Sequence, residues 1–571
     1  MIACVVMAVL AAAVIATRRG EATTGAPVFV QRDGVEAGVV LAGSGDVAPL
    51  LVDEADWPGV VRAAGDLQKD FQRVTGVLPE WLGKADSFEG NVPVVIVADT
   101  VGRSALIDRL VREGKLDVAA IAGRWEAFLI TVVEEPFSGV ERALVIAGSD
   151  RRGTIYGIYE LSEQIGVSPW YWWADVPPRR AGILTVPANT RVVEAPKVRY
   201  RGIFINDEAP AFANWAAEKF GGANHELYAH VFELILRLRG NYLWPAMWKP
   251  RAFFDDDPEN GRLADAYGVV IGTSHHEPML RAHAEWDRYG EGPWDYTTNA
   301  QRLRSFWRGG IERARDWETL ITVGMRGDGD EAMSEETNIA LLERIVADQR
   351  QIIAEVMGRP AETIPQIWAL YKEVQGYYER GMRVPEDVTL LWADDNWGNI
   401  RRLPLPEERR RSGGAGVYYH FDYVGGPRNY KWINVTPIAK VWEQMNLAWH
   451  YGADRMWIVN VGDIKPMEVP LEFFLSLAWN PDRWPYARLG AYSEAWAARQ
   501  FGREHAAEVA ALTNGYSKLN RHRTPELLAP DTYSLVNYRE SERILEAWRD
   551  LAARAEALDA AIAPEYRPAL Y

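Results

Sequence analysis

The chain has 571 residues, with 63 Lys or Arg against 79 Asp or Glu, and its formal net charge is −16. This acidic balance argues against nucleic acid as a partner, because binding a phosphate backbone needs a basic surface. The single Cys, Cys4, excludes an intramolecular disulfide and any multi-cysteine metal site. The length predicts about three domains, or one large barrel with attached domains.

Residues 1–24 contain the one candidate targeting segment. An unbroken apolar run from Ile2 to Ala16 is followed by Arg18 and Arg19. The run is shorter than the ~20 residues that a membrane-spanning helix needs, so it predicts a secretory signal and no stable membrane insertion. The positive charges follow the run instead of preceding it, so the match to a signal is imperfect. We expect a periplasmic or extracellular protein.

Residues 25–190 are predicted to form an N-terminal α/β domain. The segment 57–76 has apolar residues at helical spacing and ends at a Gly, and 153–166 has a second helical pattern. Three short β-branched runs, 94–98, 128–133 and 143–147, are typical of buried strands.

Residues 191–480 are predicted to form a (β/α)8 TIM barrel. Short apolar runs that end in polar residues alternate here with amphipathic stretches, as that fold requires. One stretch, 338–358, is a clear helix that begins at Asn338 and ends at Gly358. The eight runs are 201–205, 242–244, 269–273, 320–325, 364–370, 388–392, 416–420 and 456–461.

Residues 481–571 are rich in Ala, Leu, Glu and Arg and are predicted to form a C-terminal helical domain. One apolar stripe includes Ile544, Trp548, Leu551 and Leu558. The helical pattern runs almost to Tyr571, so we expect this domain to be truncated.

The chemistry is expected where the barrel strands end, because active sites of this fold lie at the C-terminal face. Each run is followed by polar or aromatic residues such as carboxylates, His, Asn, Arg and Trp. Trp rings beside carboxylates suit sugars, whose C–H faces are apolar and whose hydroxyls need polar partners. Glycoside hydrolysis needs two carboxyl groups, so this pattern favours a glycosidase. Taken singly, each Trp is more often core, and the acidic run 328–331 could be a solvated turn.

Metal sites fit the sequence poorly. The pair His276-Glu277 lacks the second His that a zinc protease motif places four residues on. A calcium loop beginning at Asp328 would need Gly at its sixth position, which is Met333. We therefore predict no metal.

Four strand-end segments resemble glycoside hydrolase family 115, the xylan α-glucuronidases. They are 200–208 (YRGIFINDE), 324–330 (GMRGDGD), 368–374 (WALYKEV) and 392–398 (WADDNWG), and the segment 153–161 (GTIYGIYEL) is similar to the family's N-terminal domain. The resemblance implies removal of glucuronic or 4-O-methyl-glucuronic acid from glucuronoxylan or aldouronic oligosaccharides. It also implies an inverting two-carboxylate mechanism without a cofactor, and it allows a homodimer.

The same resemblance suggests roles for individual residues. Glu373 resembles the catalytic acid or its partner, Asp330 the second essential carboxylate, and Asp207 and Asp395 are further candidates to hold the attacking water. The substrate's own carboxylate needs cations or donors. The expected substrate-binding residues are Asn206, Trp248, His275, Arg326, Tyr371, Trp392, Asn396, His420, Tyr423 and Arg428, with Lys372 and Lys431 as further cations.

Two other functions remain open at this point. The adjacent Asp394 and Asp395 resemble the carboxylate pair of substrate-assisted hexosaminidases, which would make the chain an N-acetylhexosaminidase. A non-catalytic carbohydrate-binding protein is the alternative from another class, because truncation could have removed part of the site.

Overall fold

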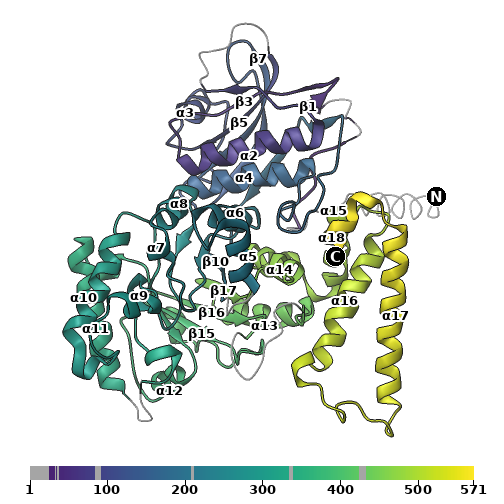
Figure 1. Cartoon of the computed structure of the whole chain (residues 1–571). Helices are drawn as coiled ribbons and strands as arrows, with labels where there is room; N and C mark the ends of the chain where they lie inside the picture. Colours follow the sequence, from purple (N-terminus) through teal and green to yellow (C-terminus); the bar gives the residue numbers. More distant parts are fainter. Residues whose placement is uncertain are drawn as a thin grey trace. The chain divides into compact units, whose positions relative to one another are not determined.

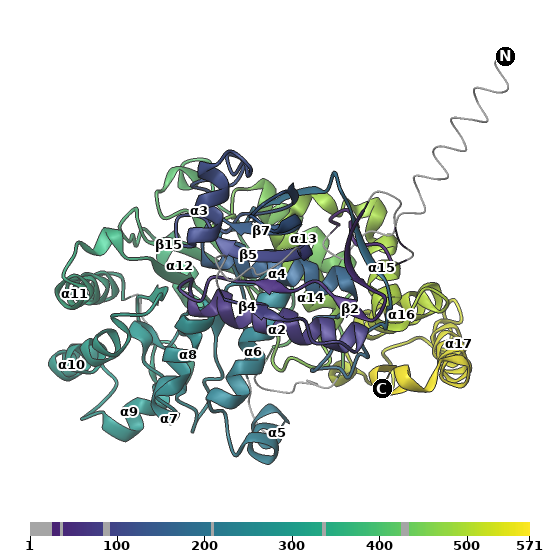
Figure 2. The same ribbon diagram turned by 90° about the horizontal axis from the view of Figure 1, so that it is seen from above.

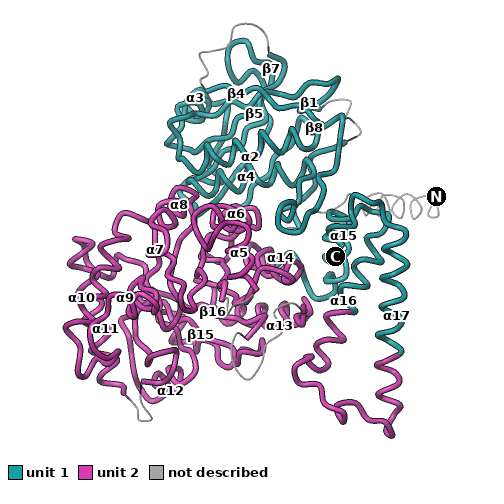
Figure 3. Tube along the Cα trace, viewed as in Figure 1, with its two compact units in different colours: residues 1–195, 482–515, 546–571 teal, residues 196–481, 516–545 magenta. Residues whose placement is uncertain are grey.

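The structure is a computed structural model that describes residues 25–32, 34, 38–83, 92–206, 211–333, 338–423 and 433–570. The chain divides into two compact units (Figure 3). The first takes in Met1–Ala195, Asp482–Gly515 and Glu546–Tyr571, and the second Pro196–Pro481 and Tyr516–Leu545. The residues of the predicted C-terminal helical domain are therefore shared between the two units. No helix of the described residues is both long and apolar enough to cross a membrane.

The first unit contains two sheets, a six-stranded one in the order β4-β3-β5-β7-β6-β9 and a three-stranded one in the order β2-β1-β8. The strands are β1 (Gly38–Gly43), β2 (Asp46–Val47), β3 (Leu50–Leu51), β4 (Trp81–Leu82), β5 (Val92–Thr100), β6 (Phe128–Glu134), β7 (Val140–Gly148), β8 (Leu184–Pro187) and β9 (Arg191–Glu194). The helices are α2 (Pro58–Thr75), α3 (Ala105–Arg112), α4 (Arg151–Ile165), α15 (Leu489–Phe501) and α18 (Arg567–Leu570). Two further helices, α16 (Ala506–His522) and α17 (Glu540–Ala561), pass from one unit into the other.

Alternation along β5 and β7 places helices on both faces of the six-stranded sheet. Val95 and Val97 pack with Ile107 and Leu110 of α3. On the opposite face, α4 approaches so closely that a Cβ on Gly157 would meet the Ile146 side chain at 2.5 Å. Helices α2 and α4 lie side by side on that face (Figures 1 and 2). The two helices and three strands that the sequence predicts here are confirmed.

The second unit is built on an eight-stranded parallel sheet in the order β12-β11-β10-β17-β16-β15-β14-β13. Its strands are β10 (Tyr200–Phe204), β11 (Tyr242–Trp244), β12 (Val270–Ile271), β13 (Ile321–Thr322), β14 (Gln366–Leu370), β15 (Thr389–Ala393), β16 (Ala415–His420) and β17 (Met456–Asn460). A parallel bridge between Ile271 and Thr319 joins the two end strands, so the sheet is curled and TIM-like. All eight predicted strands are present.

Helices surround this sheet (Figure 1). They are α5 (Ala211–Phe220), α6 (His225–Arg237), α7 (Phe253–Asp256), α8 (Glu259–Tyr267), α9 (His283–Tyr289), α10 (Tyr296–Ala314), α11 (Ile339–Met357), α12 (Glu373–Glu379), α13 (Ile438–His450) and α14 (Glu468–Trp479). The predicted helix 338–358 is α11, which ends at Gly358 in the left-handed conformation, with φ 65°. Asn338 occupies the N-cap position, but its side chain makes no capping hydrogen bond.

Aromatic side chains fill the inner face of the sheet below the strand ends. The ring centroid of Trp244 lies 5.3 Å from that of Phe204 and 5.2 Å from that of Tyr418. Every second residue of a strand faces the inside of the curled sheet. These rings therefore pack together inside it, beneath the loops that follow the strands.

Candidate active site

The candidate site lies where β12, β13, β14, β15 and β16 end. All these strands are parallel, so the residues that follow them meet at one edge of the sheet. The segments at these strand ends supply the side chains of the site. They are His275 after β12, Arg326 and Asp330 after β13, Glu373 at the start of α12, Asp394 directly after β15, and His420 as the last residue of β16.

Arg326 is the centre of the site. Its side chain is only 3% exposed, and its guanidinium binds Glu373 through two parallel hydrogen bonds, Nε to Oε1 at 3.0 Å and Nη2 to Oε2 at 2.8 Å. Nη1 also donates to both the carboxylate and the carbonyl oxygen of Asp330. One buried arginine therefore links the two carboxylates that the sequence nominates for catalysis. Charge-assisted, bidentate pairs of this kind are strong and geometrically specific.

Asp330 has three further neighbours. His275 Nε2 lies 2.9 Å from Oδ1, Lys372 Nζ lies 3.4 Å from Oδ2, and His276 Nδ1 lies 3.8 Å from Oδ1. Asp330 and Lys372 both have positive φ, 67° and 50°. Such backbone strain is costly for residues other than glycine, and it is typical of functional sites whose surroundings impose it.

Helix α11 and Trp294 fix the position of Arg326. Gln349 of α11 is fully buried and binds both backbone groups of Gly324, accepting from its N at 2.7 Å and donating to its O at 2.8 Å. Gly324 itself has φ 102°, a conformation that favours glycine. The Trp294 indole donates to the Arg326 carbonyl at 2.9 Å.

Aromatic and histidine side chains line the site beside Arg326. Tyr371 lies 4.3 Å from His275 between ring centroids, and Tyr418 lies 4.4 Å from His420. Burial raises the pKa of Tyr371, so its phenol stays protonated and can donate a hydrogen bond. The Arg326 guanidinium lies 5.6 Å from the centre of the same ring.

The histidines of the β12 loop are neutral. Burial, with Arg326 and Lys372 nearby, holds the pKa of His275 well below its ordinary value. Burial and the neighbouring His275 do the same for His276. The contact between His275 and Asp330 is therefore a hydrogen bond from a neutral imidazole, although the distance alone would also fit an ion pair.

Asp394 and Asp395 point to different places. Asp394 accepts four hydrogen bonds, from the backbone N of Asn396, Gly398 and His420 and from His420 Nδ1 at 2.6 Å. It thus orients the His420 ring toward the site. The two aspartates do not present a carboxylate pair, which removes the observation behind the hexosaminidase alternative.

Asp395 is occupied in its own loop. It accepts from the backbone N of Trp397 and from both the backbone and side-chain N of Asn399. Burial would raise the pKa of Asp395, but these hydrogen bonds outweigh it and hold the pKa below the ordinary value. Its position is that of a turn-forming residue.

The other nominated residues fall into three groups. Asn206 and Asn396 each have a buried side-chain oxygen without a hydrogen-bond partner among the described residues. Trp248 is half-buried beside His276, at 5.9 Å between ring centroids, and Tyr423 lies beside Trp397. Asp207 and Arg428, and also Lys431, lie outside the described residues.

Trp392 requires a correction. It is fully buried in β15 and packs against Tyr378 of α12 and Arg402, whose guanidinium lies 4.1 Å from the centre of the ring. It therefore faces the helix layer outside the sheet, on the side opposite Tyr418. A ring in this position has no free face for a sugar.

Sequence reasoning missed Glu277, a buried carboxyl in the β12 loop. It accepts hydrogen bonds from Ser274 Oγ at 3.2 Å and from the backbone N of His283 at 3.0 Å. Burial raises the pKa of Glu277 to about 8, so the group is mostly protonated at neutral pH. In the sequence, the only signal for Glu277 is its position directly after His275 and His276. That pattern suggests a zinc motif, but the motif's second His is absent.

A metal ion fits this site poorly. The donor atoms of His275, His276 and Asp330 lie within 4.8 Å of one another, a spacing that a metal ion could bridge. However, the same Asp330 carboxylate already binds Arg326 and Lys372. Both cations would repel a metal ion at short range.

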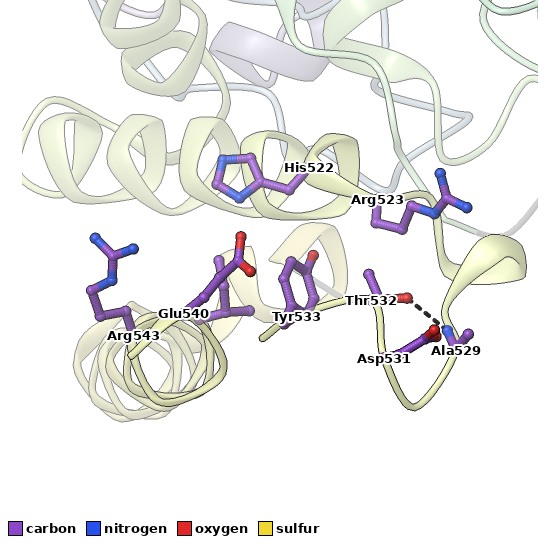
Figure 4. Close-up of a pocket in the computed structure, with 9 residues that line it drawn as sticks. His522, Arg523, Ala529, Asp531, Thr532, Tyr533, Glu540 and Arg543 are labelled. Atoms are coloured by element: carbon purple, nitrogen blue, oxygen red, sulfur yellow. Dashed lines mark hydrogen bonds between the residues drawn. The ribbon is translucent and has the colours of Figure 1, made fainter. Parts of the chain in front are cut away.

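A separate cavity of about 670 Å³ opens between α16 and α17 (Figure 4). It contains cationic and acidic side chains together, among them Arg523, Asp531 and Glu540. The cavity is separate from the strand-end site, because neither Arg326 nor any of the residues around it lines the cavity.

A TIM-like sheet whose strand ends bring two carboxylates onto one buried arginine has the carboxyl pair that glycoside hydrolysis requires. The family model "Glycosyl hydrolase family 115" matches residues 193–527. A solved family GH115 4-O-methyl-α-glucuronidase with specificity for decorated arabinogalactans is 33% identical, with a TM-score of 0.83 over 93% of this chain and 70% of that one. The chain belongs to glycoside hydrolase family 115 and is a glycosidase.

More distant structures share the fold alone. A GH138 enzyme targeting pectin rhamnogalacturonan II is 12% identical, with a TM-score of 0.56 over 92% of this chain and 67% of that one. A Streptomyces plicatus β-hexosaminidase is 11% identical, with a TM-score of 0.51 over 85% of this chain and 95% of that one. Comparison with curated protein sequences gives no match.

Proposed function

We propose that this glycosidase is an α-glucuronidase that removes glucuronic acid or 4-O-methyl-glucuronic acid side chains from a plant polysaccharide. The observation that carries the proposal is the cationic pair Arg326 and Lys372 beside two carboxylates. A sugar that bears a carboxylate needs such cations, whereas a neutral sugar does not. Membership of family 115 and the α-glucuronidase activity of the 33% identical structure support the same conclusion.

The proposed mechanism uses Glu373 and Asp330. Glu373 protonates the glycosidic oxygen as the bond to the uronic acid breaks. Asp330, whose charge is stabilised by Arg326 and Lys372, accepts a proton from the attacking water. Two carboxyl groups used in this way invert the anomeric centre, so the product forms first as the β-anomer. Proton NMR of the fresh product tests this, because an initial α-anomer would contradict inversion.

Two plant polysaccharides are candidate substrates. Glucuronoxylan and its aldouronic oligosaccharides are our first candidates, from the sequence motifs. Decorated arabinogalactan is the second, because the similar solved enzyme is specific for it. Uronic acid release from each polymer by the same preparation decides between them, and the better substrate is the one with the higher kcat/KM.

The proposal includes a periplasmic or extracellular location, which suits an enzyme that acts on a polysaccharide. Residues 1–24 carry the signal-like pattern on which this rests. Fractionation of the producing cells tests it, since activity confined to the cytoplasm would contradict it.

A further inference from the structure

Arg326 has few hydrogens left for a substrate. Its Nε and Nη2 bind Glu373, and its Nη1 binds Asp330 twice. The edge formed by Nε and Nη2 is the fork that matches a carboxylate, and Glu373 already occupies it. A uronic acid can therefore take this edge only if Glu373 leaves it.

Glu373 is the carboxylate that can leave. Asp330 is also held by His275, Lys372 and the neighbouring His276, and its side chain is 12% exposed. Among the described residues Glu373 has Arg326 as its only hydrogen-bond or ion-pair partner, and its side chain is 24% exposed. Fewer partners and greater access to solvent both favour displacement of Glu373 over Asp330.

The charge count favours protonation of the displaced group. Arg326 and Lys372 balance Asp330 and Glu373, so these four side chains sum to zero. A bound uronic acid would make the sum −1, and one proton on Glu373 restores zero. An unbalanced charge beside the buried Arg326 and the largely buried Asp330 is costly, so we expect the proton and the substrate to bind together.

We propose that Arg326 is a shared receptor, which holds Glu373 in the free enzyme and exchanges it for the substrate's carboxylate. The released Glu373 then takes up one proton from solvent and becomes the acid that protonates the glycosidic oxygen. This inference rests on the proposed function, and it also explains why the enzyme would prefer a uronic acid to a neutral sugar. A neutral glycoside would leave Glu373 bound to Arg326, in its charged form and unable to donate.

The neighbours of Glu373 should not contribute to the proton uptake that the experiment measures. The charged or titratable groups around Glu373 and its guanidinium partner are Arg326, Asp330, Lys372, His275 and Tyr377. Burial holds the pKa of His275 well below its ordinary value and raises that of Tyr377, so both stay neutral near pH 7. A proton taken up when the substrate binds is therefore not expected to go to either of these two groups.

The test is isothermal titration calorimetry of glucuronate, with glucose as the neutral counterpart, in buffers of different ionisation enthalpy at pH 7. We expect glucuronate to bind wild-type protein with uptake of about one proton, and glucose with none. Glu373→Gln should bind glucuronate without proton uptake and roughly tenfold more tightly, because the competitor for Arg326 is gone. Glu379→Gln, on the exposed end of the same helix, should behave as the wild type.

Wild-type binding of glucuronate without proton uptake, or no detectable binding, would overturn the proposal, as would a folded Glu373→Gln variant that binds glucuronate no more tightly. The wild-type comparison of glucuronate with glucose needs no variant to fold. Hydrolysis of a uronic acid substrate is measured on the same preparation. Hydrolysis without proton uptake removes the exchange alone, whereas no hydrolysis removes the proposed function.

Discussion

At the residue scale, Glu277 makes stability depend on pH. Burial raises the pKa of the Glu277 carboxyl from an ordinary value of 4.5 to about 8 in the fold. Because the folded value is raised, the stabilisation by its proton is complete below about pH 4.5 and is lost as pH rises to about 8. Glu277→Gln keeps an oxygen for the His283 amide and removes the charge. Relative to this variant, the wild type should lose about 1.4 kcal/mol of unfolding free energy per pH unit between pH 5 and 8. Urea unfolding at several pH values measures this, and parallel curves for the two proteins would contradict it.

The catalytic carboxylates form the second test at this scale. Removing a positioned acid or base costs about 10²–10⁴-fold in rate. Glu373→Gln and Asp330→Asn should each lower kcat by at least about 10²-fold while the protein stays folded.

Asp395→Asn is the contrasting variant, because the structure gives Asp395 a turn-forming role. It should lower the melting temperature more than kcat. A Glu373→Gln enzyme that retains activity would remove the assignment of the acid.

At the element scale, α11 supports the site through the hydrogen bonds of Gln349 to the Gly324 backbone. Gln349→Ala leaves the buried N and O of Gly324 without partners, which costs about 1–3 kcal/mol. Since Gly324 is two residues from Arg326, kcat should fall as well. Gln351→Ala, on the exposed face of the same helix, is the matched control. Thermal unfolding and kcat of both variants test this, and equal behaviour would show that α11 does not position Arg326.

The sequence predicts the strands of the large sheet well but not the direction of their side chains. Buried parallel strands are apolar on both faces, so they lack the alternation that separates inward from outward residues. Trp392 is the example, because only the fold reveals that it faces α12.

The sequence likewise does not predict which partners the loop side chains bind. The sequence nominates Asp395, but the turn at 394–399 directs its neighbour Asp394 to His420 instead. The long sequence separation of 47 residues between Arg326 and Glu373 likewise hides their pairing until the strands are placed. What the sequence does predict is that polar residues gather at the strand ends, because that follows from the order of the elements alone.

At the scale of the whole molecule, the hairpin between α16 and α17 is the surface on which we test the homodimer that the sequence leaves possible. Leu535, Val536 and Tyr538 are 76%, 88% and 88% exposed there. Exposed apolar clusters of this kind are typical of interaction sites. If two copies pair through this hairpin, Val536→Asp should convert a dimer to a monomer, and Leu78→Asp, at an exposed site in the other unit, should not. Light scattering after size-exclusion chromatography measures this, and a monomeric wild type would contradict it.

The central claim is that Arg326, Glu373 and Asp330 form a site for a sugar that carries a carboxylate. The most direct measurement compares two substrates that differ only at that carboxylate: a xylo-oligosaccharide with an α-1,2-linked glucuronic acid and the same compound with glucose in its place. We predict that the enzyme releases glucuronic acid from the first and leaves the second intact. Equal release of both sugars, or of neither, would contradict the account.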